Sequence, residues 1–241
     1  MAYDTRVSSV VVSGANRGIG LELCRQYAAE GWTVHAGCRN PGRAAALREV
    51  EKAHGARVIV HSLDVTEPAS VARMASALGD APLDVLVNNA GVFGPSRSGG
   101  DAGQSFGSVD YAAFEEVLRV NSLGPLRLSE ALAGHLERAG GKVATISSEM
   151  GSIAATSGHY LAYRASKAAV NMAMASLAAE LRPRGIAVVL LCPGWVRTDM
   201  GGPGAPLAPA QSARGLRERI RELSLSSSGR FLKHDGRRVA W

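Results

Sequence analysis

The stretch that decides the fold is Ser9-Val10-Val11-Val12-Ser13-Gly14-Ala15-Asn16-Arg17-Gly18-Ile19-Gly20. A β-branched run enters a glycine-rich turn, and a helix-like segment over residues 21–30 follows. Glycine permits a tight turn and lets backbone N–H groups approach a phosphate, which the N-terminus of a helix also attracts. Glycines alone would be weak support, because any strand-to-helix turn can contain one or two. With the strand and helix in place, the stretch predicts a dinucleotide-phosphate site, formed by Gly14, Asn16, Arg17, Gly18, Ile19 and Gly20.

The strand-then-helix rhythm continues along the chain. Helix-like stretches at residues 41–53, 68–78, 111–138 and 162–181 alternate with apolar strand-like runs at 33–38, 57–61, 83–87, 142–146 and 186–191. Apolar strands between amphipathic helices are typical of a parallel sheet that is covered on both faces. We therefore predict one α/β domain over residues 1–241, a Rossmann-type doubly wound parallel sheet with helices on both faces.

Three segments follow predicted strands and are candidates for substrate loops: residues 93–108, 149–160 and 194–215. Open α/β sheets bind ligands at the carboxyl ends of their strands, where these segments should lie. The alternative is that they are plain connections.

Composition excludes several classes of protein. No apolar stretch approaches the ~20 residues that a membrane-spanning helix needs, and the first residues lack the pattern of a signal peptide. Cys24, Cys38 and Cys192 are odd in number and far apart, with neither metal-ligand nor redox spacing. We expect a reduced, cytoplasmic protein with no bound metal and no membrane partner.

The positive charge is concentrated near the end of the sequence. The chain has 27 Lys and Arg against 21 Asp and Glu, a net charge of +6. Residues 211–241 hold eight of these cations and three of the acids. Arg214, Arg217 and Arg221 recur there at helical spacing beside Glu218 and Glu222, which we interpret as a solvated helix face. No nucleic-acid recognition motif accompanies the charge, so we expect no nucleic-acid partner.

Further motifs stand at the ends of the later strands. They are Asn88-Asn89-Ala90-Gly91, Asn121, Ser147-Ser148, Tyr163-Arg164-Ala165-Ser166-Lys167 and Pro193-Gly194. Together with the glycine turn, they resemble the short-chain dehydrogenase/reductase family, in the family's order. Cys38-Arg39-Asn40-Pro41 and the segment over residues 193–202 resemble the branch of sniffer-like carbonyl reductases and C-factor proteins. The resemblance implies an NADP(H)-dependent oxidoreductase that acts on alcohol or carbonyl groups.

Tyr163 and Lys167 are four residues apart and so share one face of a helix. A phenol with a pKa near 10 is a poor base at neutral pH, and a neighbouring ammonium should lower that pKa. The resemblance assigns Tyr163 as the acid/base and lets Lys167 also hold the nicotinamide ribose. The alternative is a solvated helix pair. Tyr160, one turn earlier, faces Arg164 and is read as a pocket or packing residue.

The remaining catalytic assignments rest on the resemblance. Ser147 and Ser148 point to opposite faces if extended, and alignment of the motif favours Ser148 as the hydroxyl that binds the substrate carbonyl. Asn121 would hold a water that relays protons to Lys167, although a helical Asn is more often structural.

The cofactor preference follows from the residue after the second strand. An acid there selects NAD, whereas this chain has Arg39, and Arg17 stands directly before Gly18. Two guanidinium groups can bind a 2′-phosphate, so we predict NADP(H). The resemblance adds further cofactor contacts at Asp64, Val65, Asn89, Ala90, Gly91, Pro193, Gly194, Val196 and Thr198, beside Tyr163 and Lys167.

Apolar side chains should line the substrate pocket, and the candidates are Phe93, Met150, Ile153, Trp195, Met200 and Leu207. Each of them could instead belong to the core. An apolar pocket favours a small ketone, aldehyde or quinone. The alternative function is a cofactor-binding signalling protein of C-factor type. Small residues on the helix after Tyr163, together with the family's habit, imply a homodimer or homotetramer.

Overall fold

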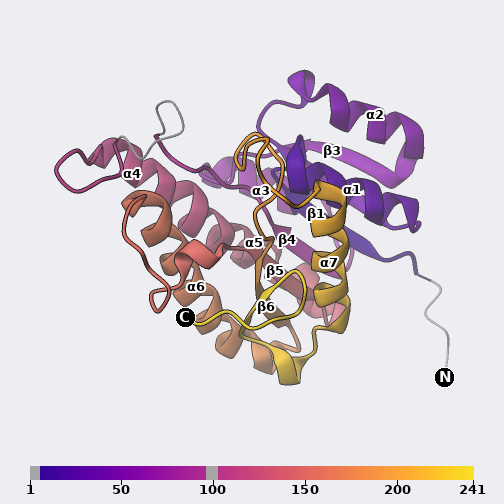
Figure 1. Cartoon of the computed structure of the whole chain (residues 1–241). Coiled ribbons are helices and arrows are strands. Elements are labelled where there is room, and N and C mark those ends of the chain that lie inside the picture. Colours follow the sequence, from indigo (N-terminus) through magenta and orange to yellow (C-terminus); the bar gives the residue numbers. More distant parts are fainter. Residues whose placement is uncertain (1–5, 96–102) are drawn as a thin grey trace.

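A seven-stranded parallel sheet forms the centre of the molecule (Figure 1). The computed structural model describes residues 6–95 and 103–241. Neighbouring strands follow the order β3-β2-β1-β4-β5-β6-β7. The strands are β1 (Ser9–Ser13), β2 (Thr33–Cys38), β3 (Val58–Ser62), β4 (Val85–Asn88), β5 (Lys142–Ile146), β6 (Ala187–Cys192) and β7 (Arg230–Lys233). The predicted Rossmann-type doubly wound sheet is confirmed.

Helices cover both faces of this sheet. They are α1 (Gly18–Ala29), α2 (Ala45–His54), α3 (Pro68–Ala77), α4 (Tyr111–Leu118), α5 (Gly124–Ala139), α6 (Leu161–Leu181) and α7 (Pro209–Glu222). In Figure 1, α1, α2 and α7 lie on the right, and α4 and α6 lie on the left. Side chains of α1, α2 and α7 share one apolar core with the strands, and those of α3, α5 and α6 share the other.

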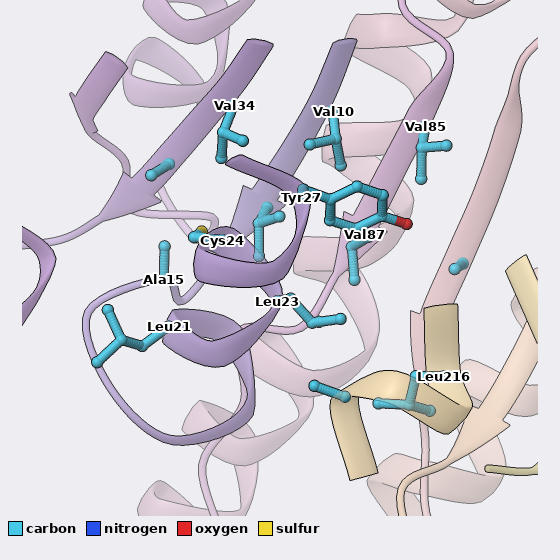
Figure 2. Packing of buried hydrophobic residues seen from close by; sticks show 14 of the residues in the cluster. Val10, Ala15, Leu21, Leu23, Cys24, Tyr27, Val34, Val85, Val87 and Leu216 are labelled. Atoms are coloured by element: carbon cyan, nitrogen blue, oxygen red, sulfur yellow. The ribbon is translucent and has the colours of Figure 1, made fainter. Parts of the chain in front are cut away.

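Successive side chains of β1 point to opposite faces of the sheet and so belong to different cores. Val10 and Val12 belong to the first core and Val11 to the second, and all three are fully buried. Figure 2 shows the first core, where Leu23 and Tyr27 of α1 lie against the strands. Full burial of each Val or Leu side chain contributes about 1.5–3 kcal/mol, so this packing holds the turn after β1 between fixed elements.

One predicted helix is interrupted. Residues 111–138 were expected to form a continuous helix, but a π-helical turn, Arg119–Leu123, separates α4 from α5. Within this turn Asn121 and Ser122 are buried and hydrogen-bond to Ser166 of α6. A π-turn widens the helix locally and is common at functional sites. Here it directs two polar side chains towards α6.

The C-terminal basic segment differs from its interpretation as a solvated face. Arg214 and Arg221 are exposed, but Arg217 is not, since its side chain is only 15% accessible. Its guanidinium lies 4.6 Å from the Tyr27 ring centroid and forms an ion pair with Glu30. The interpretation was wrong for Arg217, because α7 packs against α1.

Within the described ranges, no helix is long and apolar enough to cross a membrane. The same residues contain no group of three or more His, Cys, Asp and Glu side chains arranged to hold a metal ion.

Candidate active site

A cleft of about 340 Å³ opens at the carboxyl edge of the sheet, where β1 and β4 lie side by side. Helical connections leave these two strands in opposite directions, which is where doubly wound sheets bind ligands. The cleft brings together fifteen of the eighteen predicted cofactor residues. They are Gly14, Asn16, Arg17, Gly18, Ile19, Arg39, Asp64, Val65, Asn89, Ala90, Gly91, Tyr163, Lys167, Pro193 and Thr198.

The turn after β1 is shaped for the close approach of a ligand. Gly14 and Gly18 have φ of +67° and +56°, a backbone conformation that residues with a Cβ rarely adopt. A Cβ at Gly14 would lie 2.9 Å from the Cα of Ala90 and so would fill the floor of the turn. No side chain caps α1 at Arg17. The first N–H groups of any α-helix also lack intrahelical acceptors. Those of α1 can therefore donate hydrogen bonds to an anion.

The segment after β4 supports this turn. Asn89 Nδ2 donates to the carbonyls of Ser13 and Gly14 at 3.0 and 3.1 Å. The Ser13 hydroxyl in turn accepts the backbone N–H groups of Asn89 and Ala90 at 3.0 and 3.1 Å. Ser13 was not among the predicted site residues, although its position directly before Gly14 at a strand end was a usable signal.

Three of the predicted cofactor residues do not line the cleft. A Cβ at Gly20 would clash with the Gly14 carbonyl and the Asn89 amide, so this glycine lets α1 pack close to the turn. Gly194 has φ of +82° and directs the chain after β6 past Leu207. Val196 is buried and pairs with Leu207 in an isolated bridge. All three residues therefore fix the backbone that surrounds the cleft and do not line it themselves.

Cations gather at the end of the cleft beside β2. Arg17, Arg39 and Arg43 all line it, and Arg39 and Arg43 are exposed. Arg43, in the turn that leads to α2, was not predicted. After the neighbouring strand β3, Asp64 Oδ1 accepts the Thr66 backbone N–H at 2.9 Å and the Thr66 hydroxyl at 2.7 Å, which fixes the carboxylate.

Tyr163 and Lys167 lie on the inner face of α6 and are 7% and 5% exposed. Lys167 Nζ donates to the Ile146 carbonyl at 2.9 Å and lies 5.6 Å from the Tyr163 ring centroid. Burial lowers the pKa of Lys167 to about 8. Burial also raises the pKa of Tyr163 to about 12, and a hydrogen bond with Ser148 opposes this rise.

The expected lowering of the Tyr163 pKa is therefore wrong for the protein without a ligand. Desolvation of the phenolate outweighs the stabilising contacts around it. At neutral pH the phenol keeps its proton and can donate it.

The two serines after β5 point in different directions. The Ser147 hydroxyl is buried and donates to Asn171 Oδ1 at 2.6 Å, whereas the Ser148 hydroxyl accepts the Met150 N–H at 3.2 Å and is close enough to Tyr163 to lower its pKa. The backbone beyond Ser148 is held by Cys192 Sγ, which accepts the Glu149 N–H at 3.3 Å. This geometry is compatible with the choice of Ser148, and the contact made by Cys192 was not predicted.

The comparisons with known proteins agree with this geometry. The family model described as short chain dehydrogenase matches residues 8–205. The chain is a short-chain dehydrogenase/reductase. It is 48% identical to C-signal of Myxococcus xanthus over 162 residues, which cover 66% of this chain and 93% of that protein.

Two solved structures extend the likeness over almost the whole dehydrogenase. The NADPH-bound carbonyl reductase from chicken fatty liver is 33% identical with a TM-score of 0.88, and the alignment covers 98% of this chain and 100% of that one. The carbonyl reductase Sniffer of D. melanogaster is 30% identical with the same TM-score and coverage. The predicted resemblance to this branch is confirmed.

Asn121 of this dehydrogenase uses its side chain to join two segments. Oδ1 accepts the Val92 N–H, and Nδ2 donates to the Val92 carbonyl, each at 2.8 Å. Nδ2 also lies 3.0 Å from the Ser166 hydroxyl. The amide therefore fixes the strand-end segment of β4 to α6, and the predicted water-holding role stays a prediction.

The predicted substrate side chains differ in their surroundings. Phe93 packs against Tyr163, and Met200 lines the cleft. Ile153 and Trp195 are 73% and 62% exposed, and the Trp195 indole donates to the Gly201 carbonyl at 2.7 Å. Met150 is half-buried, and Leu207 packs beneath Gly194. Part of the predicted loop at 93–108, residues 96–102, lies outside the described residues.

Proposed function

We propose that this dehydrogenase reduces the carbonyl group of a small apolar ketone, aldehyde or quinone, with NADPH as the reductant. The observation that carries the proposal is the buried Tyr163 phenol, whose pKa of about 12 keeps it protonated beside the Ser148 hydroxyl. A protonated donor suits reduction, because the carbonyl oxygen needs a proton as it becomes an alcohol.

The residues present fit an NADP(H) molecule. The turn at Gly14 and Gly18 would receive the pyrophosphate, and Arg17, Arg39 and Arg43 line the end of the cleft where a 2′-phosphate needs cations. No acid stands at position 39 to favour an unphosphorylated ribose. Held by these residues, NADPH would supply the hydride for the carbonyl carbon. The chicken relative carries NADPH, which supports this assignment.

The chain's own groups divide the remaining work. Ser148 donates a hydrogen bond to the carbonyl oxygen and stabilises the charge that develops there, and Tyr163 gives this oxygen its proton. Lys167, with its pKa near 8, returns a proton to Tyr163 from solvent. Asn121 is proposed to hold the water for this relay. The predicted loop 194–215 ends earlier than expected, because α7 begins at Pro209. The described loop residues 93–95, 103–108, 149–160 and 194–208 of the one domain are proposed to surround the substrate.

A direct assay tests the proposal. Oxidation of NADPH is followed with a panel of ketones, aldehydes and quinones, in parallel for the wild-type chain and for Tyr163→Phe. We expect turnover by the wild type and loss of at least ~10³-fold of kcat in the variant, which should still bind NADPH. Absence of turnover in the wild type, despite tight binding of NADPH, would favour the second candidate.

That second candidate is a cofactor-binding signalling protein. It is supported by the 48% identity to C-signal, which covers 66% of this chain. Signalling would need the phosphate turn but would not need the Ser148, Tyr163 and Lys167 constellation.

The exposed face of α6 is a candidate surface for self-association. The outer face of α6 carries exposed Ala165, Ala169 and Met172, and small side chains allow two helices to pack closely. We propose a homodimer or homotetramer in the cytoplasm. Light scattering behind a size-exclusion column, with Met172→Glu as the disrupting variant, tests the assembly.

A further inference from the structure

Gln104 is a fully buried polar residue that the sequence analysis did not single out, with 0% of its surface exposed. Every polar group of its side-chain amide has a partner. Oε1 accepts the backbone N–H of Tyr163 at 3.0 Å. Nε2 donates to the carbonyls of Phe93 and Pro95 at 3.1 and 3.0 Å. Its own backbone carbonyl accepts the N–H of Leu161 at 2.9 Å.

The contacts with the Tyr163 and Leu161 N–H groups cap the catalytic helix. The N–H groups in the first turn of any helix have no intrahelical acceptor, and α6 begins at Leu161, so Leu161 and Tyr163 both need one. Tyr160, the residue before the helix, provides no side-chain cap. Gln104 supplies both acceptors, and it lies 59 residues before Tyr163 in the sequence. The helical turn that carries the Tyr163 phenol is therefore anchored to the loop after β4.

The local backbone makes this anchor necessary. His159 and Tyr160 have φ of +58° and +51°, a left-handed conformation that is unfavourable for residues other than glycine. Such a conformation persists only where the surrounding contacts enforce it. Within the described residues, Gln104 supplies two hydrogen bonds directly beyond this strained pair.

The other arm of the amide fixes the aromatic wall of the site. The carbonyl of Phe93 accepts from Nε2, and the Phe93 ring centroid lies 4.6 Å from that of Tyr163 and 5.1 Å from that of Tyr160. Gly94 has φ of +91°, and a Cβ there would lie 3.3 Å from the Gln104 amide, so the loop closes tightly around this side chain. One amide thus holds the phenol on one side and the ring that packs on it on the other.

We propose that Gln104 is a positioning residue of the catalytic site. Its side-chain oxygen Oε1 positions Tyr163 by binding the first turn of α6. Its NH₂ group positions Phe93, which lies beside Tyr163 in the proposed substrate pocket. The two arms act on different kinetic constants, because the first affects proton donation and the second affects substrate binding. The inference rests on the proposed carbonyl reductase function.

Two substitutions separate the arms. Gln104→Met keeps the volume and removes both arms, whereas Gln104→Glu keeps an acceptor for the Tyr163 N–H and removes the two donors to Phe93 and Pro95. Leu132→Ala, a fully buried change in α5, is the control for general destabilisation. For each chain we would measure kcat and KM for the carbonyl substrate, the Kd for NADPH, and hydrogen exchange of the amides of residues 161–163.

We expect Gln104→Met to lower kcat about tenfold and to raise KM about threefold, with the Kd for NADPH unchanged, because an unmade helix cap and two unsatisfied carbonyls displace both walls. Exchange of the amides at 161–163 should become about tenfold faster. Gln104→Glu should recover kcat to within about threefold but keep the raised KM, since the anion suits a helix N-terminus. Leu132→Ala should change none of the kinetic constants more than about twofold.

Wild-type kcat and KM in Gln104→Met would overturn the proposal. So would a parallel loss of kcat and NADPH binding in this variant and in Leu132→Ala, or a Gln104→Glu chain as slow as Gln104→Met. A wild-type chain that reduces no carbonyl would overturn the proposed function alone. In that case the exchange rates of Gln104→Met against wild type would still decide whether Gln104 holds the start of α6.

Discussion

Arg17 Nη1 lies 2.7 Å from Asp199 Oδ2, so the turn after β1 and the loop after β6 are joined across the mouth of the cleft. The two side chains are 68% and 73% exposed. An exposed ion pair contributes about 0–1 kcal/mol to stability, so a ligand phosphate can displace the carboxylate at little cost. One of the two arginines predicted to select NADP(H) is therefore paired with a carboxylate of this chain.

This pairing predicts that Asp199→Asn tightens the binding of NADPH. Removal of a competing carboxylate worth up to about 1 kcal/mol should lower the Kd by up to about fivefold. The gain should shrink at 0.5 M salt and should be absent for NADH, which has no 2′-phosphate. Fluorescence titration gives both constants. The matched control is Asp235→Asn, another exposed acid with an arginine partner, Arg237, outside the residues that line the cleft. An Asp199→Asn chain with unaltered NADPH affinity at low salt would show that the pair does not compete with the cofactor.

Arg39→Asp should erode the preference for NADPH over NADH. A carboxylate at the end of β2 repels the 2′-phosphate and can accept a hydrogen bond from an unphosphorylated ribose. Charged hydrogen bonds are worth about 1.5–3 kcal/mol, so we expect the ratio of kcat/KM for the two cofactors to fall by at least about tenfold. Arg57→Asp, an exposed basic residue before β3 that does not line the cleft, is the control for charge alone. Equal kinetics with both cofactors in the wild type would contradict the role given to Arg39.

The pH dependence of reduction should follow Lys167. Burial lowers its pKa from 10.5 to about 8, so the ammonium loses its proton as the pH rises through 8. Tyr163 stays protonated until about 12 and cannot produce this limb. We expect kcat/KM for NADPH, which reports the free enzyme, to be level near pH 7 and to decline above about pH 8. If kcat/KM stays level up to pH 9.5, Lys167 does not supply the proton to Tyr163.

A second pH effect concerns stability and lies far from catalysis. His35 Nδ1 lies 3.0 Å from His61 Nε2 on the neighbouring strand, and burial lowers the pKa of both, that of His35 from 6.5 to about 4. A depressed histidine pKa means that the unfolded chain binds protons first. The free energy of unfolding should therefore decrease as the pH falls below 6.5 and reach a loss of about 2–3 kcal/mol near pH 4 from His35.

Urea denaturation at pH 8, 6 and 5 measures this effect. His35→Gln should show a shallower decrease between pH 6.5 and 5 than the wild type, and the measurement at pH 8 corrects for any change that does not depend on protonation. Parallel curves for the two chains would show that the histidine pair is not responsible.

The local signals in the sequence were sufficient for the fold and for the glycine turn after β1. The run Val10, Val11 and Val12 is buried on both faces, so only a sheet covered by helices can accommodate it. Gly14 and Gly18 adopt positive φ that glycine alone adopts readily, which ties this spacing to one turn geometry. The spacing of Tyr163 and Lys167 places both on one helix face whatever surrounds them.

Contacts between distant segments could not be read in the same way. The strand β7 is short and partly exposed, and only pairing with β6 defines it. Arg217 looks like a solvated residue until α7 packs on α1 and places it over Tyr27. The pKa of Tyr163 is raised because its side chain is buried. The residues near Tyr163 in the sequence do not predict this burial.

By itself, the sequence determined the doubly wound sheet, the glycine turn after β1 and the shared helix face of Tyr163 and Lys167, because each depends on residues close together in the chain. The tertiary structure alone decided how these parts are held in place. Gln104 in one loop caps the helix of Tyr163, Ser13 and Asn89 secure the turn, and Asp199 meets Arg17 across the cleft. Hydrogen bonds and ion pairs of this kind depend on distances in space, and only the packing of the two cores sets those distances.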